Sequence, residues 1–142
     1  MKKSTITLLS ALLVAPMSTF AGSMTSSAPA NAEVYFVQPS DGATVQQNVK
    51  VVFGLRNMGV APAGVDKSNT GHHHLLIDTE VPTDLSKPLP ATDKIKHFGG
   101  GQTETEIKLA PGTHTLQLLL GNHAHVPHSS PVISDKITIK VE

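Results

Sequence analysis

The sequence contains no cysteine and no tryptophan, and only one tyrosine and four phenylalanines among its 142 residues. Without thiols the chain has no disulfide, no cysteine nucleophile, and no thiolate ligand for iron–sulfur clusters or metal ions. The shortage of aromatic rings makes binding by ring stacking an unpromising function. Eleven basic and eleven acidic residues balance to a formal net charge of 0, so the positive excess typical of nucleic-acid binding is missing.

The first 21 residues have the order of charge and hydrophobicity typical of a secretory signal peptide. Met1-Lys2-Lys3 supplies a positive start, residues 6–14 are mainly apolar, and Thr19-Phe20-Ala21 offers small residues to a signal peptidase. The apolar stretch has about half of the roughly 20 residues that a spanning helix needs. We therefore expect cleavage after Ala21, export to the periplasm or beyond the cell, and no membrane span after cleavage.

The remaining chain divides into a short leader and one domain. Residues 22–32 are small and polar, which predicts a flexible leader. Residues 33–142 have a length that suits a single domain with one hydrophobic core. Because the chain has no cysteine, this core has to supply the stability that disulfides give many exported domains.

The domain repeatedly shows apolar residues at every second position, as in half-buried strands. Leu116, Leu118 and Leu120 share one face of such a stretch, for example, and glycine and proline separate the stretches. Strands are expected near residues 33–37, 49–56, 72–78, 93–98, 103–109, 113–121 and 133–141. The pattern predicts an all-β fold, an immunoglobulin-like antiparallel β-sandwich of about seven strands. The residues expected to share its core are Phe53, Ile107, Leu116, Leu118, Ile137 and Ile139.

All eight histidines lie between positions 72 and 128, and the predicted topology makes their distribution informative. They are His72, His73, His74, His97, His114, His123, His125 and His128. In a seven-strand sandwich the connections between the second and third, fourth and fifth, and sixth and seventh strands emerge at one end. Seven of the histidines lie in or beside these connections, whereas His114 is expected at the other end.

The alternation of side chains predicts which histidines share a face. If Leu75 points into the core, His72 and His74 point outward. The strand near residues 113–121 is the expected neighbour, and extension of its alternation places His123 and His125 on the same face. Two His-x-His pairs would then meet across neighbouring strands, with about 5 Å between facing Cβ atoms. Neutral imidazole is a good ligand for Cu²⁺ and Zn²⁺.

These four histidines are the predicted metal ligands, and His97 is a reserve ligand. Histidines also have structural roles, which are the roles expected for His73 and His114.

Several segments together resemble a family of small secreted bacterial domains, domain of unknown function 4399. The segments are GHHHLLID, HFGGGQTE, PGTHTLQLLLGNHAHVPH and PVISDKITIKV, and the resemblance covers roughly residues 34–142. It implies an exported β-sandwich and brings no established catalytic or binding residues. The general plan is also similar to small periplasmic copper-carrying β-sandwiches. Those carriers typically use an N-terminal histidine, whereas cleavage here would leave Gly22.

The sequence therefore favours a periplasmic binding module over an enzyme. The predicted role is a carrier that sequesters or delivers Cu²⁺ or Zn²⁺. The alternative is a structural or interaction module of the envelope that contacts a protein or a glycan and binds no metal. A third hypothesis is a pH-responsive adaptor, because imidazoles change charge near pH 6.5 or so. Convergence of three or more imidazole nitrogens on one point would favour the metal.

Overall fold

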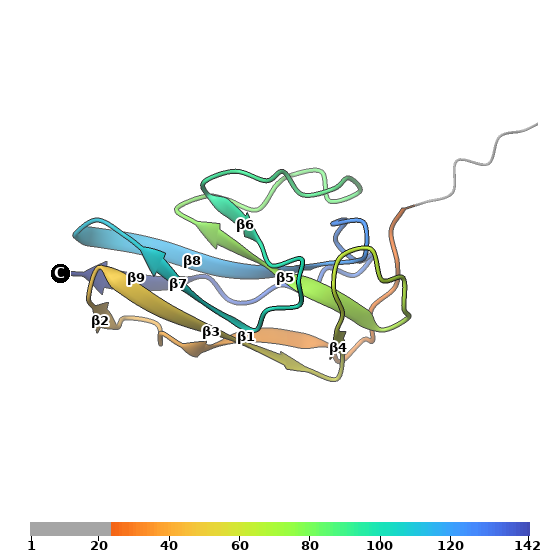
Figure 1. Cartoon of the computed structure of the whole chain (residues 1–142), viewed down its shortest axis with the longest axis horizontal. Coiled ribbons are helices and arrows are strands. Elements are labelled where there is room, and N and C mark those ends of the chain that lie inside the picture. Colours follow the sequence, from red (N-terminus) through yellow and green to blue (C-terminus); the bar gives the residue numbers. More distant parts are fainter. Residues whose placement is uncertain (1–23) are drawn as a thin grey trace, which may run out of the picture.

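The computed structural model describes residues 24–142, and these residues form a two-layer β-sandwich (Figure 1). The predicted signal peptide, residues 1–21, lies outside the described residues, so its cleavage stays a prediction. The strands are β1 (Glu33–Gln38), β2 (Thr44–Val45), β3 (Asn48–Arg56), β4 (Gly59–Val60), β5 (Thr70–Ile77), β6 (Ile95–His97), β7 (Glu104–Lys108), β8 (Gly112–Gly121) and β9 (Ile137–Val141).

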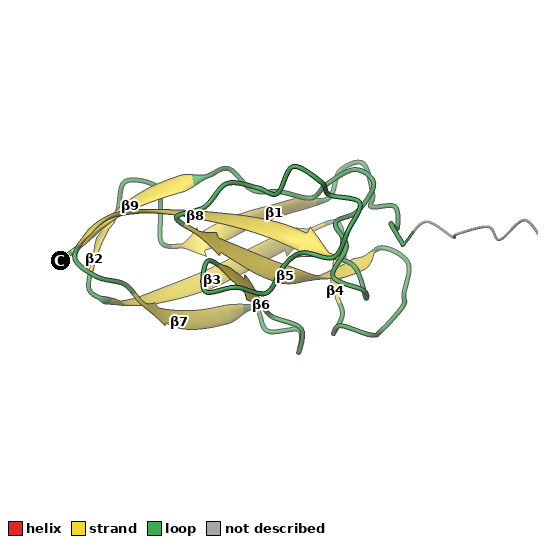
Figure 2. Cartoon of the chain, turned by 90° about the horizontal axis from the view of Figure 1, so that it is seen from above, coloured by secondary structure: helices red, strands yellow, loops and turns green. Residues whose placement is uncertain are grey.

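The two layers are sheets of unequal size (Figure 2). One sheet has the order β1-β3-β7, and the other has the order β2-β9-β8-β5-β4, with β6 also paired to β5. All pairs are antiparallel except β2 with β9 and β4 with β5, which are parallel. The prediction of an all-β sandwich is confirmed, and all seven expected strands are present. The short strands β2 and β4 were not predicted from the sequence.

The main core lies between the two sheets and contains the residues that the alternation predicted. Leu116 and Leu118 of β8 are fully buried there, and Phe53 of β3 faces them from the other sheet. The other predicted members of this core are the buried Ile137 and Ile139 and the partly buried Ile107.

A second, smaller apolar cluster lies on the outer face of the larger sheet. Leu76 of β5 and Leu119 of β8 point away from the main core and pack with Leu89 and Ile95. The chain between β5 and β6 passes over this face (Figure 1), and we name residues 79–94 the covering segment. Because β5 packs on both faces, every residue from position 71 to position 77 is buried.

The described part of the predicted leader follows the end of the sandwich that carries the histidines. The backbone oxygen of Met24 accepts a hydrogen bond from Nδ2 of Asn122, and the oxygen of Ser26 accepts one from the backbone nitrogen of Ser129. Within residues 24–142 there is no helix long and apolar enough to cross a membrane.

Candidate metal centre

Strand β5 places two imidazoles on the outer face of the larger sheet. His73 points into the main core, where its ring centroid lies 5.0 Å from that of Phe53. Because side chains alternate along a strand, His72 and His74 point to the opposite face, as the sequence predicted. Both side chains are 0% exposed. Two histidine rings are thus fixed side by side on a fully buried strand, with 4.6 Å between their centroids.

His125 reaches the same place from the connection between β8 and β9. Strand β8 ends at Gly121, and the chain then turns around the buried side chain of Asn122. The Oδ1 atom of Asn122 accepts hydrogen bonds from the backbone nitrogens of Ala124 and Val126. His125 has a φ of 62° within this turn. The turn brings the ring of His125 to 4.7 Å from that of His72, centroid to centroid.

The expected meeting of two His-x-His pairs across the ladder is wrong. Across the ladder His72 faces Gly121, and His74 faces Leu119. The prediction extended the register of β8 to His123 and His125, but the turn begins before either residue. His125 therefore approaches His72 and His74 from a loop that lies over the sheet face.

Three imidazole nitrogens converge at this point. The Nε2 atom of His72 lies 3.0 Å from the Nδ1 atom of His125, and the Nε2 atom of His74 lies 3.4 Å from it. The three candidate ligand atoms all lie within 4.8 Å of one another. Two nitrogens bound to one ion at about 2.0–2.1 Å lie roughly 2.9 Å apart in a square-planar arrangement and roughly 3.3 Å apart in a tetrahedral one. The separations of the His125 nitrogen from those of His72 and His74 match ligands of a single ion.

The environment keeps these imidazoles neutral at pH 7. Burial, with the nearby His125 and His97, lowers the pKa of His72 to about 4. Burial also lowers the pKa of His74 to about 2, assisted by its histidine neighbours. The pKa of His125 is lowered by burial and by His97. A neutral imidazole has a free lone pair, which is the form that binds a metal ion.

His97 lies beside this three-histidine group, as the fourth imidazole. It faces His74 across the β5–β6 ladder, and the ring centroids are 4.4 Å apart. Its ring lies 4.8 Å from that of His125. The Nε2 atom of His97 donates a hydrogen bond to the backbone oxygen of Pro90 at 3.1 Å. Because a carbonyl can only accept, this bond leaves the lone pair on Nδ1, where it is free to bind an ion.

The structure places His123 apart from the three-histidine group. Its Nδ1 atom lies 3.4 Å from Oδ1 of Asp66, which is exposed to solvent. His128 is buried and donates from Nε2 to the backbone oxygen of Thr70.

His114 lies near the start of β8, at the end of that strand away from the three-histidine group, as expected. Its Nδ1 atom lies 2.6 Å from Oδ2 of Asp78, and its Nε2 atom lies 2.8 Å from the oxygen of Ala110. It has no part in the three-histidine group.

Gly121 is a residue of this centre that the sequence analysis missed. A Cβ atom at this position would lie 2.5 Å from Cε1 of His74 and 3.2 Å from its Nδ1. The ring of His74 therefore needs a glycine at position 121, against which it packs. The pair Gly121-Asn122 is also a turn signal, which marks the end of β8 in the sequence.

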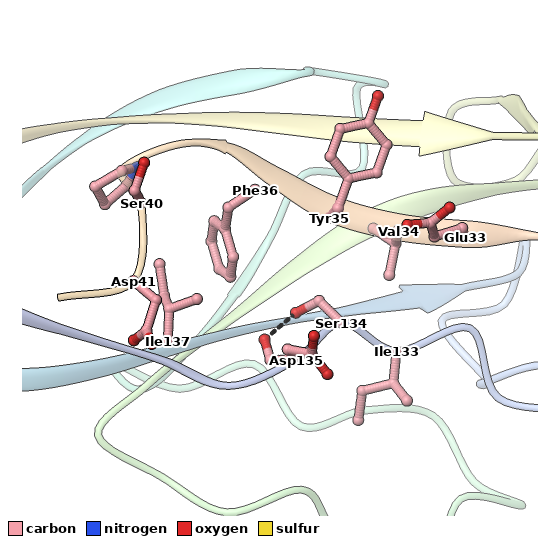
Figure 3. A pocket seen from close by; sticks show the side chains of 11 residues that line it. Glu33, Val34, Tyr35, Phe36, Ser40, Asp41, Ile133, Ser134, Asp135 and Ile137 are labelled. Carbon is pink, nitrogen blue, oxygen red and sulfur yellow. Dashed lines mark hydrogen bonds between the residues drawn. The ribbon is translucent and has the colours of Figure 1, made fainter. Parts of the chain in front are cut away.

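A groove of about 390 Å³ lies elsewhere, between β1 and residues 133–137 (Figure 3). Three of its polar side chains are already used by the fold. Glu33 pairs with Arg56, and Oδ1 of Asp41 accepts a hydrogen bond from the backbone nitrogen of Thr138. The hydroxyl of Ser134 donates to the oxygen of Asp135 (Figure 3). No histidine lines this groove, and it is not a candidate for the metal chemistry.

Comparison with known proteins gives a family and no function. No curated protein matches the chain. Among solved structures, an endo-beta-1,4-mannanase from Thermotoga petrophila is similar, with 18% identity and a TM-score of 0.47. The match covers 78% of this chain and 20% of the mannanase, so the chain spans about a fifth of that enzyme. A likeness at this level carries no argument.

The family model described as Domain of unknown function (DUF4399) matches residues 51–142. This range is more than half of the chain and includes every histidine, so the chain belongs to this family.

Proposed function

We propose that this protein is a periplasmic carrier that binds one Cu²⁺ or Zn²⁺ ion. The ligands are Nε2 of His72, Nε2 of His74 and Nδ1 of His125, which lie within 4.8 Å of one another, and Nδ1 of the neighbouring His97 is a reserve fourth ligand. The observation that carries the proposal is the convergence of three neutral imidazole nitrogens on one point.

The hydrogen bonding within the group supports an ion there. The Nδ1 atom of His125 has either one proton or one lone pair, so it can satisfy only one of the two ε nitrogens that face it. The other ε nitrogen then stays buried without a good partner, which costs about 1–3 kcal/mol. An ion accepts a lone pair from all three nitrogens at once. The arrangement is therefore better satisfied with an ion than without one.

The donor set favours particular ions. All the nitrogens belong to imidazoles, which suit Cu²⁺ and Zn²⁺, and Cu²⁺ binds more tightly than Zn²⁺ to a given nitrogen site. If His97 joins the other three, four imidazoles fill the positions of a tetrahedral ion and leave none open for a substrate. This favours binding and delivery over catalysis.

Titration calorimetry of the tag-free protein with Cu²⁺ and Zn²⁺ tests the proposal. We expect one ion per chain, bound more tightly than about 10 μM, which corresponds to roughly −7 kcal/mol. A His74→Ala/His125→Ala variant should lose this binding, whereas His114→Ala at the other end of β8 should keep it. Failure of the wild-type protein to bind either ion, or equal loss in the control, would leave an envelope interaction module as the better account.

The periplasmic location is part of the proposal and has its own test. It rests on the charge, apolar stretch and small residues of positions 1–21. N-terminal sequencing of protein from the periplasmic fraction should give a chain that starts at Gly22. A chain that retains Met1 in that fraction would contradict cleavage.

A further inference from the structure

Two adjacent residues of the covering segment contact both of the outer histidines, His97 and His125. The backbone nitrogen of Leu89 donates a hydrogen bond to the backbone oxygen of His125 at 2.9 Å. The backbone oxygen of Pro90 accepts the hydrogen bond from Nε2 of His97 at 3.1 Å. One dipeptide thus connects two candidate ligands that come from different parts of the chain.

The side chain of Leu89 anchors this dipeptide to the sheet. It is 4% exposed and packs in the small apolar cluster with Leu76, Ile95 and Leu119. Leu119 faces His74 across the β5–β8 ladder, so the cluster lies directly beside the metal centre. Burial of a leucine side chain is the main force available to hold such a segment on the sheet.

The sequence around Leu89 makes the contact stiff. Pro88 and Pro90 flank it, and proline has a fixed φ and no N–H group. The amide of Leu89 is therefore the single backbone donor between Lys87 and Ala91. The fold uses this donor on His125.

The inner and outer ligands are held in different ways. His72 and His74 belong to β5, which is paired on both sides within the sheet. His97 ends a strand of three residues, and His125 lies in a turn. The sheet fixes the inner pair, whereas the outer pair depends on contacts from the covering segment.

We infer that the covering segment controls release of the ion, with Leu89 as the positioning residue. Packing of Leu89 holds His97 and His125 toward His72 and His74, and loss of that packing frees both outer ligands together. Packing of the covering segment on the sheet would raise the affinity for the ion by some factor. By linkage, a bound ion must favour the packed segment over the unpacked one by the same factor. The inference rests on the proposed metal binding.

The first test compares three variants of the tag-free protein loaded with Cu²⁺. Loss of a residue that orients metal ligands typically costs about 10–100-fold in affinity, so Leu89→Ala should release copper to EDTA at least about tenfold faster than wild type. Leu85→Ala is the control, because Leu85 lies in the same segment and packs against the same cluster, whereas the backbone bond to His125 comes from Leu89. It should stay within about twofold. Leu89→Met keeps the volume of the side chain and should restore slow release.

A spectroscopic readout separates positioning from a general loss of stability. The electron paramagnetic resonance spectrum of bound Cu²⁺ should change in Leu89→Ala, because the outer nitrogens shift or leave. It should not change in Leu85→Ala.

Hydrogen exchange of wild-type protein gives a test that needs no variant. Exchange of the Leu89 amide should slow by at least about tenfold when Cu²⁺ binds. Copper release from Leu89→Ala at the wild-type rate, an equal effect of Leu85→Ala, or unchanged Leu89 exchange would each overturn the inference. In all three cases wild-type protein still binds copper. If wild-type protein bound neither Cu²⁺ nor Zn²⁺, the proposed function and, with it, the inference would be overturned.

Discussion

The Nε2 atom of His72 lies 3.0 Å from the Nδ1 atom of His125, although the two residues are 53 positions apart in the sequence. The first belongs to a strand that is buried on both faces, and the second belongs to a turn. This contact, with the matching one from His74, defines where an ion would bind.

The first prediction separates His125 from its near neighbour His123. Removal of a residue that only hydrogen-bonds to a metal ligand costs about 10–100-fold in metal affinity. Removal of a ligand itself, in His125→Ala, should therefore cost at least about 100-fold. His123→Ala should change the affinity by less than about threefold, because His123 contacts Asp66 instead. Competition with a chelator of known affinity measures both. A larger loss in His123→Ala than in His125→Ala would contradict the assignment of ligands.

A second prediction concerns Gly121, against which the ring of His74 packs. Gly121→Ala would place a methyl group 2.5 Å from Cε1 of His74, so the ring must move. We expect a loss of about 1–3 kcal/mol in the free energy of unfolding from this crowding, together with weaker metal binding. Gly59→Ala is the control, since its Cβ would meet the Cγ2 atom of Thr70 at 3.3 Å and the backbone oxygen of Asn69 at 3.7 Å, both much farther than 2.5 Å. Denaturant unfolding and metal titration of the two variants provide the comparison, and a tolerated Gly121→Ala would show that the ring has room.

A third prediction concerns His73, the imidazole that points into the main core. Its side chain is 1% exposed, and neither of its ring nitrogens makes a hydrogen bond of good geometry. The backbone of Gln102 interacts with the ring only weakly, because burial still lowers the pKa of His73 to about 4. Such unmade bonds cost about 1–3 kcal/mol, so His73→Leu should raise the free energy of unfolding of the metal-free protein by roughly 1 kcal/mol. His128→Leu should do the reverse, because it leaves the oxygen of Thr70 without its donor. Urea unfolding at pH 7 measures both, and destabilisation by His73→Leu would mean that the imidazole has a bonding role.

The fourth prediction is a pH dependence at the opposite end of the sandwich. The hydrogen bond that His114 donates to Asp78 raises the pKa of His114, although partial burial opposes the change. Burial by itself would raise the pKa of Asp78, but the hydrogen bonds from His114 and from the backbone of Thr115 outweigh it and hold that pKa below its usual value. Because the folded-state pKa of His114 is raised, its stabilising contribution is complete below the usual value of 6.5 and is lost as the pH rises through the folded-state pKa.

The variant Asp78→Asn measures this contribution. It should lower the free energy of unfolding by roughly 1 kcal/mol at pH 6, a value that allows for solvent screening, and by less at pH 9. Asp66→Asn, which alters an exposed pair, should have little effect at either pH. A deficit of Asp78→Asn that grows from pH 6 to pH 9 would have the wrong sign for this account.

The part of the centre that belongs to β5 could be predicted because alternation along a strand is a local property. Once Leu75 is assigned to the core, His73 must point inward and His72 and His74 outward. The structure has this arrangement. The same alternation predicted the main core, since Leu116 and Leu118 alternate with the outward residues of β8.

The position of His125 could not be predicted from alternation because it depends on where β8 ends. The predicted alternation continues past Gly121 to His125, whereas the chain turns after Gly121 around the Asn122 side chain. A turn changes both the direction and the face of the residues that follow, so His123 and His125 separate. Burial of the outer face was also missed, because the packing of Leu89 on Leu76 and Leu119 joins segments that are distant in the sequence.

In a chain without cysteine, a metal ion between β5 and the β8–β9 connection would act as a cross-link. An ion bound by His74 and His125 would close a loop of 51 positions, as a covalent cross-link between those positions would. For a disulfide, closure of a loop of that length is worth roughly 4 kcal/mol, mainly through the unfolded chain. A metal cross-link differs in the chemistry that opens it: protons and chelators remove it, and reductants of disulfides do not. The chain would thus have a reversible cross-link that is indifferent to the thiol redox state of its compartment.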